Sequence, residues 1–231
     1  MKKIYTSIDI GSDTVKFLVA EEYEGKFYVL ASCVIKSKGI RKGLIVDSNL
    51  AVNTIKDGIK RINDELGFEI KKVLINVPDY NVKFMYVTGK TQVNGVVGTD
   101  DINKVIKDSV YGKIDKEYEL VTVIPLEFVL DEKEGIEYPC GMNGKELNLK
   151  GIMVTVPKKN IYSVISVVEG TGLEVVDITL SGLSDYYQVG NKKLDTKLGA
   201  VINLGHETTN VSIINGGKLM NTETIQLGGL N

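Results

Sequence analysis

The stretch IDIGSDTVKFLV (residues 8–19) decides the expected fold, because INLGHETTNVSI (residues 202–213) repeats its pattern. Each copy has an apolar segment containing Asp or Asn, then a glycine, two polar residues, a threonine and a second apolar segment. Two such strand, turn, strand units in one chain predict two related halves. Gly11 and Gly205 would allow a positive φ or a close backbone approach at each turn.

The residues around each turn are of types that hold a phosphate. Backbone N–H groups of a tight turn can converge on an anion, and nearby hydroxyls add donors. The predicted nucleotide-binding residues are Asp9, Gly11, Ser12, Asp13, Thr14 and Lys16 in the first copy, and Asn203, Gly205, His206, Thr208 and Thr209 in the second. One copy alone is more often an ordinary β-hairpin, but the repeat favours a nucleotide cleft between two halves.

Two side chains of the first copy have expected roles of their own. Asp9 lies at the end of a predicted strand and could hold a water molecule bound to Mg²⁺, so it is the predicted metal residue. Lys16 could reach back to a phosphate.

Composition excludes several other classes of function. With 28 basic and 30 acidic residues, the chain has no basic excess to neutralise nucleic-acid phosphates, so no nucleic-acid partner is expected. The single histidine, His206, supplies little for histidine-based catalysis. No segment approaches the ~20 apolar residues of a transmembrane helix, and no signal peptide is expected. Cys33 and Cys140 are far apart in sequence, which is typical of reduced thiols in a cytoplasmic protein.

Hydrophobic spacing predicts an α/β chain that opens in the order β-β-β-α-β. Three strands are expected within residues 2–37, and a buried strand is expected at residues 71–78. Between them, a helix is predicted by the apolar stripe Val52, Ile55, Ile59, Ile62 and Leu66. Asp47 or Ser48 can cap this helix, and Gly67 can end it.

Residues 80–156 break this rhythm and are predicted to form an inserted α+β subdomain. Thr99 could cap a helix whose apolar face is Ile102, Val105 and Ile106. Residues 132–146 are rich in turn residues and are predicted to be a loop. The α/β pattern then resumes with a helix (158–172), a strand (173–180), a short helix (181–190) and three strands (197–205, 209–215 and 218–227).

Longer motifs carry a family resemblance. Residues 7–21 (SIDIGSDTVKFLVAE) resemble the first phosphate motif of the actin-like ATPases, and residues 200–219 (AVINLGHETTNVSIINGGKL) resemble the second. Within that superfamily, GIRKGLIVD (39–47) and VIPLEFVLDEKEGIEYPCGMNGKEL (123–147) are similar to signatures of FtsA, a bacterial cell-division family. Together these motifs cover essentially the whole chain.

The resemblance implies the fold class: α/β, an actin-like (ribonuclease H-like) ATPase domain with an inserted α+β subdomain and a truncated second half. Residues 1–79 and 157–195 would form domain 1A, residues 80–156 the inserted domain 1C, and residues 196–231 the opening β-hairpins of domain 2A. The family's adenosine-binding loop, its FtsZ-binding domain 2B and its C-terminal membrane-anchoring helix would lie outside this sequence.

The resemblance also implies a function. FtsA is a cell-division adaptor that binds ATP with Mg²⁺, self-associates into actin-like polymers, and links the FtsZ ring to the cytoplasmic face of the membrane and to later division proteins. Domain 1C contributes partner contacts in the family, so Glu134, Gly135, Gly141, Met142 and Gly144 are candidate partner-binding residues. A solvated loop is an equal alternative for this stretch.

The second phosphate motif departs from the family pattern, which is usually Asp-Ile-Gly-Gly-Gly-Thr-Thr-Asp. Asn203 replaces its first aspartate, while His206 and Glu207 replace two glycines. An amide holds the water shell of Mg²⁺ less well and cannot act as a base, and Glu207 is expected to repel a triphosphate. We therefore expect weak or absent hydrolysis and, in a truncated chain, weak nucleotide binding. The alternatives are a PilM-like pilus-assembly adaptor and an active ATPase or kinase of the same superfamily.

Overall fold

The computed structural model describes residues 3–190 and 195–230, and its first element is a five-stranded mixed sheet. Its strands are β1 (Lys3–Ile10), β2 (Thr14–Tyr23), β3 (Lys26–Lys36), β6 (Lys72–Val77) and β11 (Glu174–Leu180), in the spatial order β11-β6-β1-β2-β3. The first three strands pair antiparallel, and β6 pairs parallel with both β1 and β11. This sheet brings the ends of β1 and β6 together at one edge.

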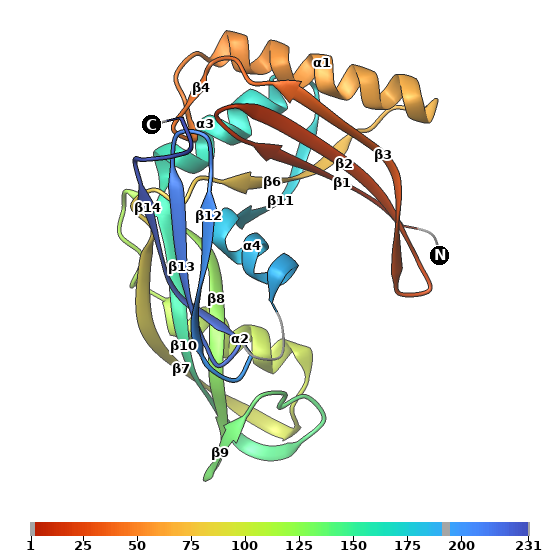
Figure 1. Cartoon of the computed structure of the whole chain (residues 1–231). Coiled ribbons are helices and arrows are strands. Elements are labelled where there is room, and N and C mark those ends of the chain that lie inside the picture. The colour runs from red at the N-terminus through yellow and green to blue at the C-terminus, as the bar shows by residue number, and fades with distance from the viewer. Residues whose placement is uncertain (1–2, 191–194, 231) are drawn as a thin grey trace.

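Helices α1 (Ser48–Leu66) and α3 (Lys158–Glu169) cover one face of this sheet (Figure 1). The predicted ends of α1 are confirmed: the Asp47 carboxylate accepts a hydrogen bond from the Leu50 N–H, and Gly67 adopts a left-handed conformation with φ 73°. Gly58 lies against the buried Phe17 ring so closely that a Cβ at this position would be 2.2 Å from ring atoms. A single added carbon atom at residue 58 would therefore disturb the packing of α1 against the sheet.

A two-stranded ladder that the sequence pattern did not predict precedes α1. It consists of β4 (Ile40–Arg41) and β5 (Leu44–Ile45), and the turn between them has positive φ at Lys42 and Gly43. This β4–β5 turn borders the cleft described below.

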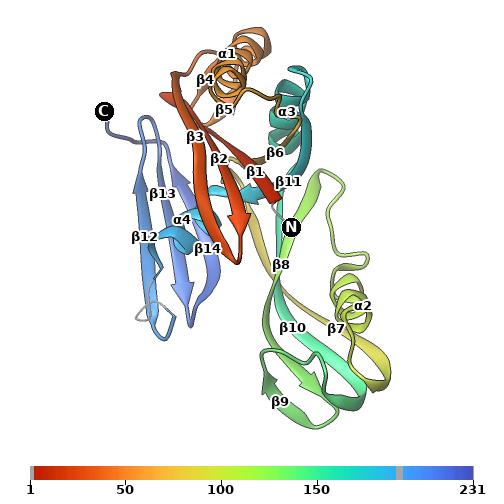
Figure 2. The ribbon, with the colours of Figure 1, turned by 90° about the vertical axis from the view of Figure 1, so that its right-hand side faces the viewer.

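The inserted segment forms a separate four-stranded antiparallel sheet with α2 (Thr99–Val110) on one face (Figure 2). Its strands are β7 (Lys83–Val96), β8 (Tyr118–Leu130), β9 (Lys133–Ile136) and β10 (Asn143–Pro157), in the order β7-β10-β8-β9. The predicted apolar face of α2 is confirmed, because Ile102, Val105 and Ile106 pack into the core of this subdomain. Gly89 on β7 allows α2 to approach closely, since a Cβ there would be 2.4 Å from the Val105 carbonyl oxygen.

Two predictions for this segment are corrected. Thr99 is the first residue of α2 rather than its cap; the cap is Gly98, whose N–H donates to the Asp101 carboxylate at 3.1 Å. Residues 132–146 are not a loop throughout, because they contain β9 and the start of β10. β9 forms a hairpin with β8, and Asp131 in the turn between them accepts the N–H groups of Lys145 and Glu146, which ties the start of β10 to this turn.

The third sheet contains the second copy of the repeated pattern. Its strands are β12 (Leu198–Leu204), β13 (Thr209–Asn215) and β14 (Lys218–Ile225), in that order, as predicted. Helix α4 (Ser181–Val189) lies between this sheet and β11 (Figures 1 and 2). The domain boundaries implied by the family resemblance stay a prediction.

Candidate functional site

The two repeated turns have the same geometry. The N–H of Gly11 donates to the Thr14 carbonyl oxygen at 3.1 Å, and the N–H of Gly205 donates to the Thr208 carbonyl oxygen at 2.9 Å. A Cβ on either glycine would come within 3 Å of that same oxygen, so both positions require glycine because of close approach. Neither glycine has a positive φ, the other possibility that the sequence allowed.

Both turns border one cavity of about 610 Å³. The predicted nucleotide-binding residues that line it are Asp9, Gly11, Ser12, Asp13, Thr14, Lys16, Asn203, Gly205, His206 and Thr208. The structure does not bring Thr209 to the cavity, because its hydroxyl donates to the Leu227 carbonyl oxygen at 2.7 Å. The two motifs, far apart in sequence, therefore form opposite sides of one polar cleft.

Asp9 is held in place at the floor of the cleft. Its carboxylate accepts hydrogen bonds from Lys16 Nζ at 2.8 Å and from Asn76 Nδ2 at 3.0 Å. Asn76, near the end of β6, also accepts the Ile10 N–H and contacts the Ser181 hydroxyl. Lys16 is thus paired with Asp9 and neutralises it. Sequence reasoning missed Asn76, although a polar residue in an apolar strand was a signal for it.

Asp185 on α4 is a second carboxylate of the cleft that sequence reasoning missed. Asn203 Nδ2 donates to its carboxylate at 2.7 Å. Burial raises the pKa of Asp185, the hydrogen bond from Asn203 opposes this, and the nearby Asp9 carboxylate raises it further. An aspartate at position 203 could not donate this hydrogen bond, and its negative charge would repel Asp185. The amide of Asn203 therefore has a hydrogen-bond partner that the aspartate of the family pattern would lack.

Asp79, just after β6, occupies the N-terminus of α4. Its carboxylate accepts the N–H groups of Ser181 at 3.1 Å and Gly182 at 2.8 Å, and the side chain is buried. Burial raises the pKa of Asp79 to about 7, with the backbone hydrogen bond from Gly182 acting in the opposite direction. The positive end of this helix is therefore filled by the chain's own carboxyl group rather than left open to a ligand.

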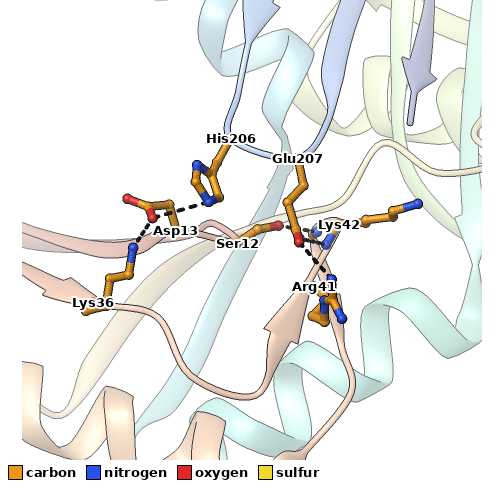
Figure 3. A network of polar contacts seen from close by, with 8 residues as sticks. Ser12, Asp13, Lys36, Arg41, Lys42, His206 and Glu207 are labelled. Carbon is orange, nitrogen blue, oxygen red and sulfur yellow. Dashed lines mark hydrogen bonds and ion pairs between the residues drawn. The ribbon is translucent and has the colours of Figure 1, made fainter. Parts of the chain in front are cut away.

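Ion pairs cross the rim of the cleft (Figure 3). Asp13 in the first turn pairs with Lys36 and lies 3.5 Å from His206 Nε2 of the second turn. The hydrogen bond from Lys36 lowers the pKa of Asp13.

Glu207 makes the other rim contact. Its Oε2 accepts the Lys42 N–H at 2.6 Å, and Oε1 lies 3.5 Å from Arg41 Nη2. The Lys42 N–H is the main cause that lowers the pKa of Glu207. Its carboxylate is turned to the β4–β5 turn, and Glu207 is not among the residues that line the cavity, so the expectation that Glu207 repels a triphosphate stays a prediction.

The lining fits a magnesium–nucleotide complex better than a bare polyphosphate. Four lining carboxyl groups, those of Asp9, Asp13, Asp79 and Asp185, face only two lysines, Lys16 and Lys42. No group of three His, Cys, Asp or Glu side chains within residues 3–190 and 195–230 could hold a metal alone. A cation here would therefore need ligand oxygens or water as further partners.

A buried hydroxyl offers a further contact. Tyr80 borders the cavity, and its Oη is buried without a hydrogen-bond partner among the described residues. Such a group is costly to bury unless a ligand or water satisfies it.

The candidate partner-binding residues do not share one surface role. Glu134, Gly135 and Gly141 are exposed, with Glu134 Oε1 3.7 Å from Lys150 Nζ. Met142 instead packs against the core of the inserted subdomain, and a Cβ on Gly144 would be 2.5 Å from the Leu130 side chain. Met142 and Gly144 are half-buried, so the first three are the more exposed of the five, and a partner-binding role stays a prediction for all of them.

The fold is that of the actin-like proteins. The chain superposes with a TM-score of 0.65 on a PilM-PilN type IV pilus biogenesis complex, at 14% identity, covering 97% of this chain and 62% of that chain. It superposes with a TM-score of 0.56 on the ethanolamine utilization protein EutJ from Carboxydothermus hydrogenoformans, at 16% identity, covering 98% of this chain and 53% of that chain. These likenesses establish the fold class predicted from the two phosphate motifs.

Within this class the chain is FtsA-like, as the motifs predicted. Residues 80–155 match the SHS2 domain inserted in FtsA. The chain is 31% identical to the cell division protein FtsA of Streptococcus pneumoniae, over 97% of this chain and 50% of that protein. It is 28% identical to that of Bacillus subtilis, over 99% of this chain and 53% of that protein. The chain therefore spans about half the length of the curated relatives it matches.

None of the helices in the described part of the chain combines the length and the apolar character of a membrane span.

Proposed function

We propose that this chain acts in bacterial cell division as the nucleotide-binding part of an FtsA-like adaptor. The observation that carries the proposal is the cavity of about 610 Å³ bordered by two turns of matching geometry, in a chain that carries the SHS2 insertion. The ligand would be ATP or ADP with Mg²⁺, with its phosphates against the turns that start at Gly11 and Gly205. The cation would supply positive charge that the acid-rich lining lacks.

In this proposal the nucleotide is a conformational ligand, and hydrolysis is weak or absent. A hydrolytic site needs a base within reach of the attacking water. Asn203 has no carboxylate, and Asp9 is paired with Lys16. Asp185 accepts a hydrogen bond from Asn203, and both oxygens of Asp79 accept backbone N–H groups of α4, so neither carboxylate is free of protein partners. Phosphate release at a rate indistinguishable from buffer, with Mg-ATP bound, is the expected result; clear turnover would contradict this part.

The adaptor role would place the protein on the cytoplasmic face of the membrane, between the FtsZ ring and later division proteins, with polymer contacts between copies. The SHS2 match and the FtsA relatives support this role over a pilus-assembly adaptor of the PilM type, which is similar at the level of fold.

Calorimetric titration with Mg-ATP tests the ligand, with Asp9→Asn and Gly11→Ala as variants expected to abolish the heat of binding. Pelleting with and without Mg-ATP tests polymer formation, and co-sedimentation with FtsZ tests the adaptor role in a chain of full family length. Absence of binding heat in both this chain and the longer one would refute nucleotide binding. Binding to a pilus membrane protein instead of division proteins would favour the PilM-like alternative.

A further inference from the structure

The β4–β5 turn contacts both of the repeated turns that border the cavity. The Gly43 N–H donates to Ser12 Oγ of the first turn at 2.8 Å, and the Lys42 N–H donates to Glu207 Oε2 of the second turn at 2.6 Å. Lys42 and Gly43 both line the cavity, and Figure 3 shows Ser12, Lys42 and Glu207 next to one another. The β4–β5 turn is therefore a third segment of the cleft, beside the two that the repeated pattern predicted.

Lys42 carries a positive charge that is not used within the cleft. Two lysines line the cavity, and Lys16 Nζ is paired with the Asp9 carboxylate at 2.8 Å. Lys42 Nζ instead donates to the neutral Gln226 Oε1 at 3.0 Å, and among the described residues no ion pair joins it to a carboxylate. In a lining with four carboxyl groups, Lys42 is thus the lysine that an anionic ligand could take as a partner without separating an ion pair.

The end of the Lys42 side chain is easily redirected, whereas its backbone is fixed. Lys42 and Gln226 are both exposed, so water competes with the hydrogen bond between them and its net strength is small. A lysine has a flexible four-carbon stem and three donors on its ammonium group. The backbone of Lys42 has a left-handed φ of 50°, and its N–H is held by Glu207. A fixed backbone and a movable charged group suit a residue that reaches toward a ligand.

A buried hydroxyl beside the same turn also points to a ligand on this side of the cleft. A Cβ on Gly43 would be 3.8 Å from the Tyr80 ring, so the ring lies next to the turn. Tyr80 borders the cavity, and its Oη has no hydrogen-bond partner among the described residues. A buried donor without a partner is costly, so an acceptor such as a phosphate oxygen would stabilise this side of the cleft.

We propose that Lys42 is a phosphate-binding residue of the cleft, supplied by the β4–β5 turn. Without ligand, its ammonium group donates to Gln226. With a nucleotide bound, the ammonium group leaves Gln226 and donates to a phosphate oxygen between the two repeated turns. The inference rests on the proposed nucleotide site and adds to it a cation from a segment outside both repeated turns.

Calorimetry with Mg-ATP on wild type, Lys42→Gln and Lys42→Arg tests the contact. Lys42→Gln is expected to lower affinity about tenfold, equivalent to one hydrogen bond to a charged group. Lys42→Arg keeps the charge and is expected to stay within about threefold of wild type. Added salt should reduce the difference between wild type and Lys42→Gln, because mobile ions screen exposed charges. If Lys42→Gln does not fold, Lys42→Asn removes the same charge with a residue that tolerates the left-handed conformation.

The matched control is Lys38→Gln, which removes the same charge from an exposed position four residues away that does not line the cavity. It is expected to leave the affinity unchanged. Gln226→Glu gives Lys42 a carboxylate partner and is expected to lower affinity by up to about fivefold, the upper range for an exposed ion pair. In the Lys42→Gln background the same substitution is expected to change affinity less than about twofold, which separates this competition from general charge repulsion.

Chemical labelling gives an independent readout at the ammonium group itself. Saturating Mg-ATP is expected to slow acetylation of Lys42 by acetic anhydride, measured by peptide mass spectrometry, and to leave the rate at Lys38 unchanged. Wild-type affinity in Lys42→Gln, an equal loss in Lys38→Gln, or unprotected acetylation of Lys42 would overturn the assignment while leaving nucleotide binding intact. Failure of the wild-type chain and of one of full family length to bind Mg-ATP would instead overturn the proposed function, and the role of Lys42 with it.

Discussion

The buried carboxyl group of Asp79 should make stability depend on pH in a way that Asp79→Asn removes. Burial raises its pKa from 3.8 to about 7, so between these values the folded protein binds a proton that the unfolded chain does not. Asp79 therefore contributes stability that is complete below about pH 4 and is lost as the pH rises through about 7. A shift of about three pKa units corresponds to a change of about 4 kcal/mol, with a slope of at most ~1.4 kcal/mol per pH unit.

The assay is urea unfolding of wild type and Asp79→Asn, followed by far-UV circular dichroism because the chain has no tryptophan. The free energy of unfolding of wild type minus that of the variant should fall steadily from about pH 4 to about pH 8. Titrating groups that do not interact with Asp79 cancel in this difference, whereas Asp185, whose charge also raises the pKa of Asp79, contributes to it. Asp57→Asn, an exposed carboxylate on α1, is the control and should give a flat difference. A difference for Asp79 that varies by less than about 1 kcal/mol over this range would refute the reasoning.

Three further predictions concern close packing and the second turn. Gly58→Ala should destabilise the protein by about 1–3 kcal/mol despite the ~1 kcal/mol gain in helix propensity, and Phe17→Leu should reduce this cost in a thermal or urea unfolding cycle. Gly89→Ala should cost more than ~2 kcal/mol in the same measurement, because its Cβ would meet backbone atoms of α2 that cannot move alone. Asn203→Asp should lower stability by about 1–2 kcal/mol in EDTA, since it replaces a donor to Asp185 with a second carboxylate, and Mg²⁺ should restore part of the loss.

Sequence patterns predicted those helices and turns whose ends are set by residues only a few positions apart in the chain. The helix over Ser48–Leu66 was predicted together with both ends, because Asp47 and Gly67 act on backbone groups three or four residues away. The repeated turns were predicted as a pair, because each glycine meets a carbonyl oxygen only three positions further along the chain. The short strand Lys133–Ile136 was missed, since its glycine and charged residues have no strand pattern of their own, although its partner is the adjacent strand β8.

Side-chain partners from distant segments could not be predicted in this way. The Glu207 carboxylate was expected to lie near a triphosphate, and its hydrogen bond from the Lys42 N–H was missed because the hydrophobic pattern did not reveal the β4–β5 turn. Asp185 lies on a short helix whose position beside Asn203 depends on packing of the third sheet. Burial, which decides the pKa of Asp79, is likewise a property of the assembled core rather than of neighbouring residues.

The unusual residues of the second turn are explained better by compensation than by loss of a site. His206 has Asp13 within 3.5 Å, and Glu207 has Lys42 and Arg41. Each replacement of a small turn residue by a charged or titratable one is thus met by an opposite charge or donor from the other half of the molecule. Charged side chains without partners at this rim would repel one another or remain solvated. The contacts of His206 and Glu207 instead hold the two halves together around the cleft. Because the second turn makes these contacts with the opposite half itself, no ligand is needed to join the two halves. We therefore expect a bound nucleotide to change the contacts between the halves rather than to create them.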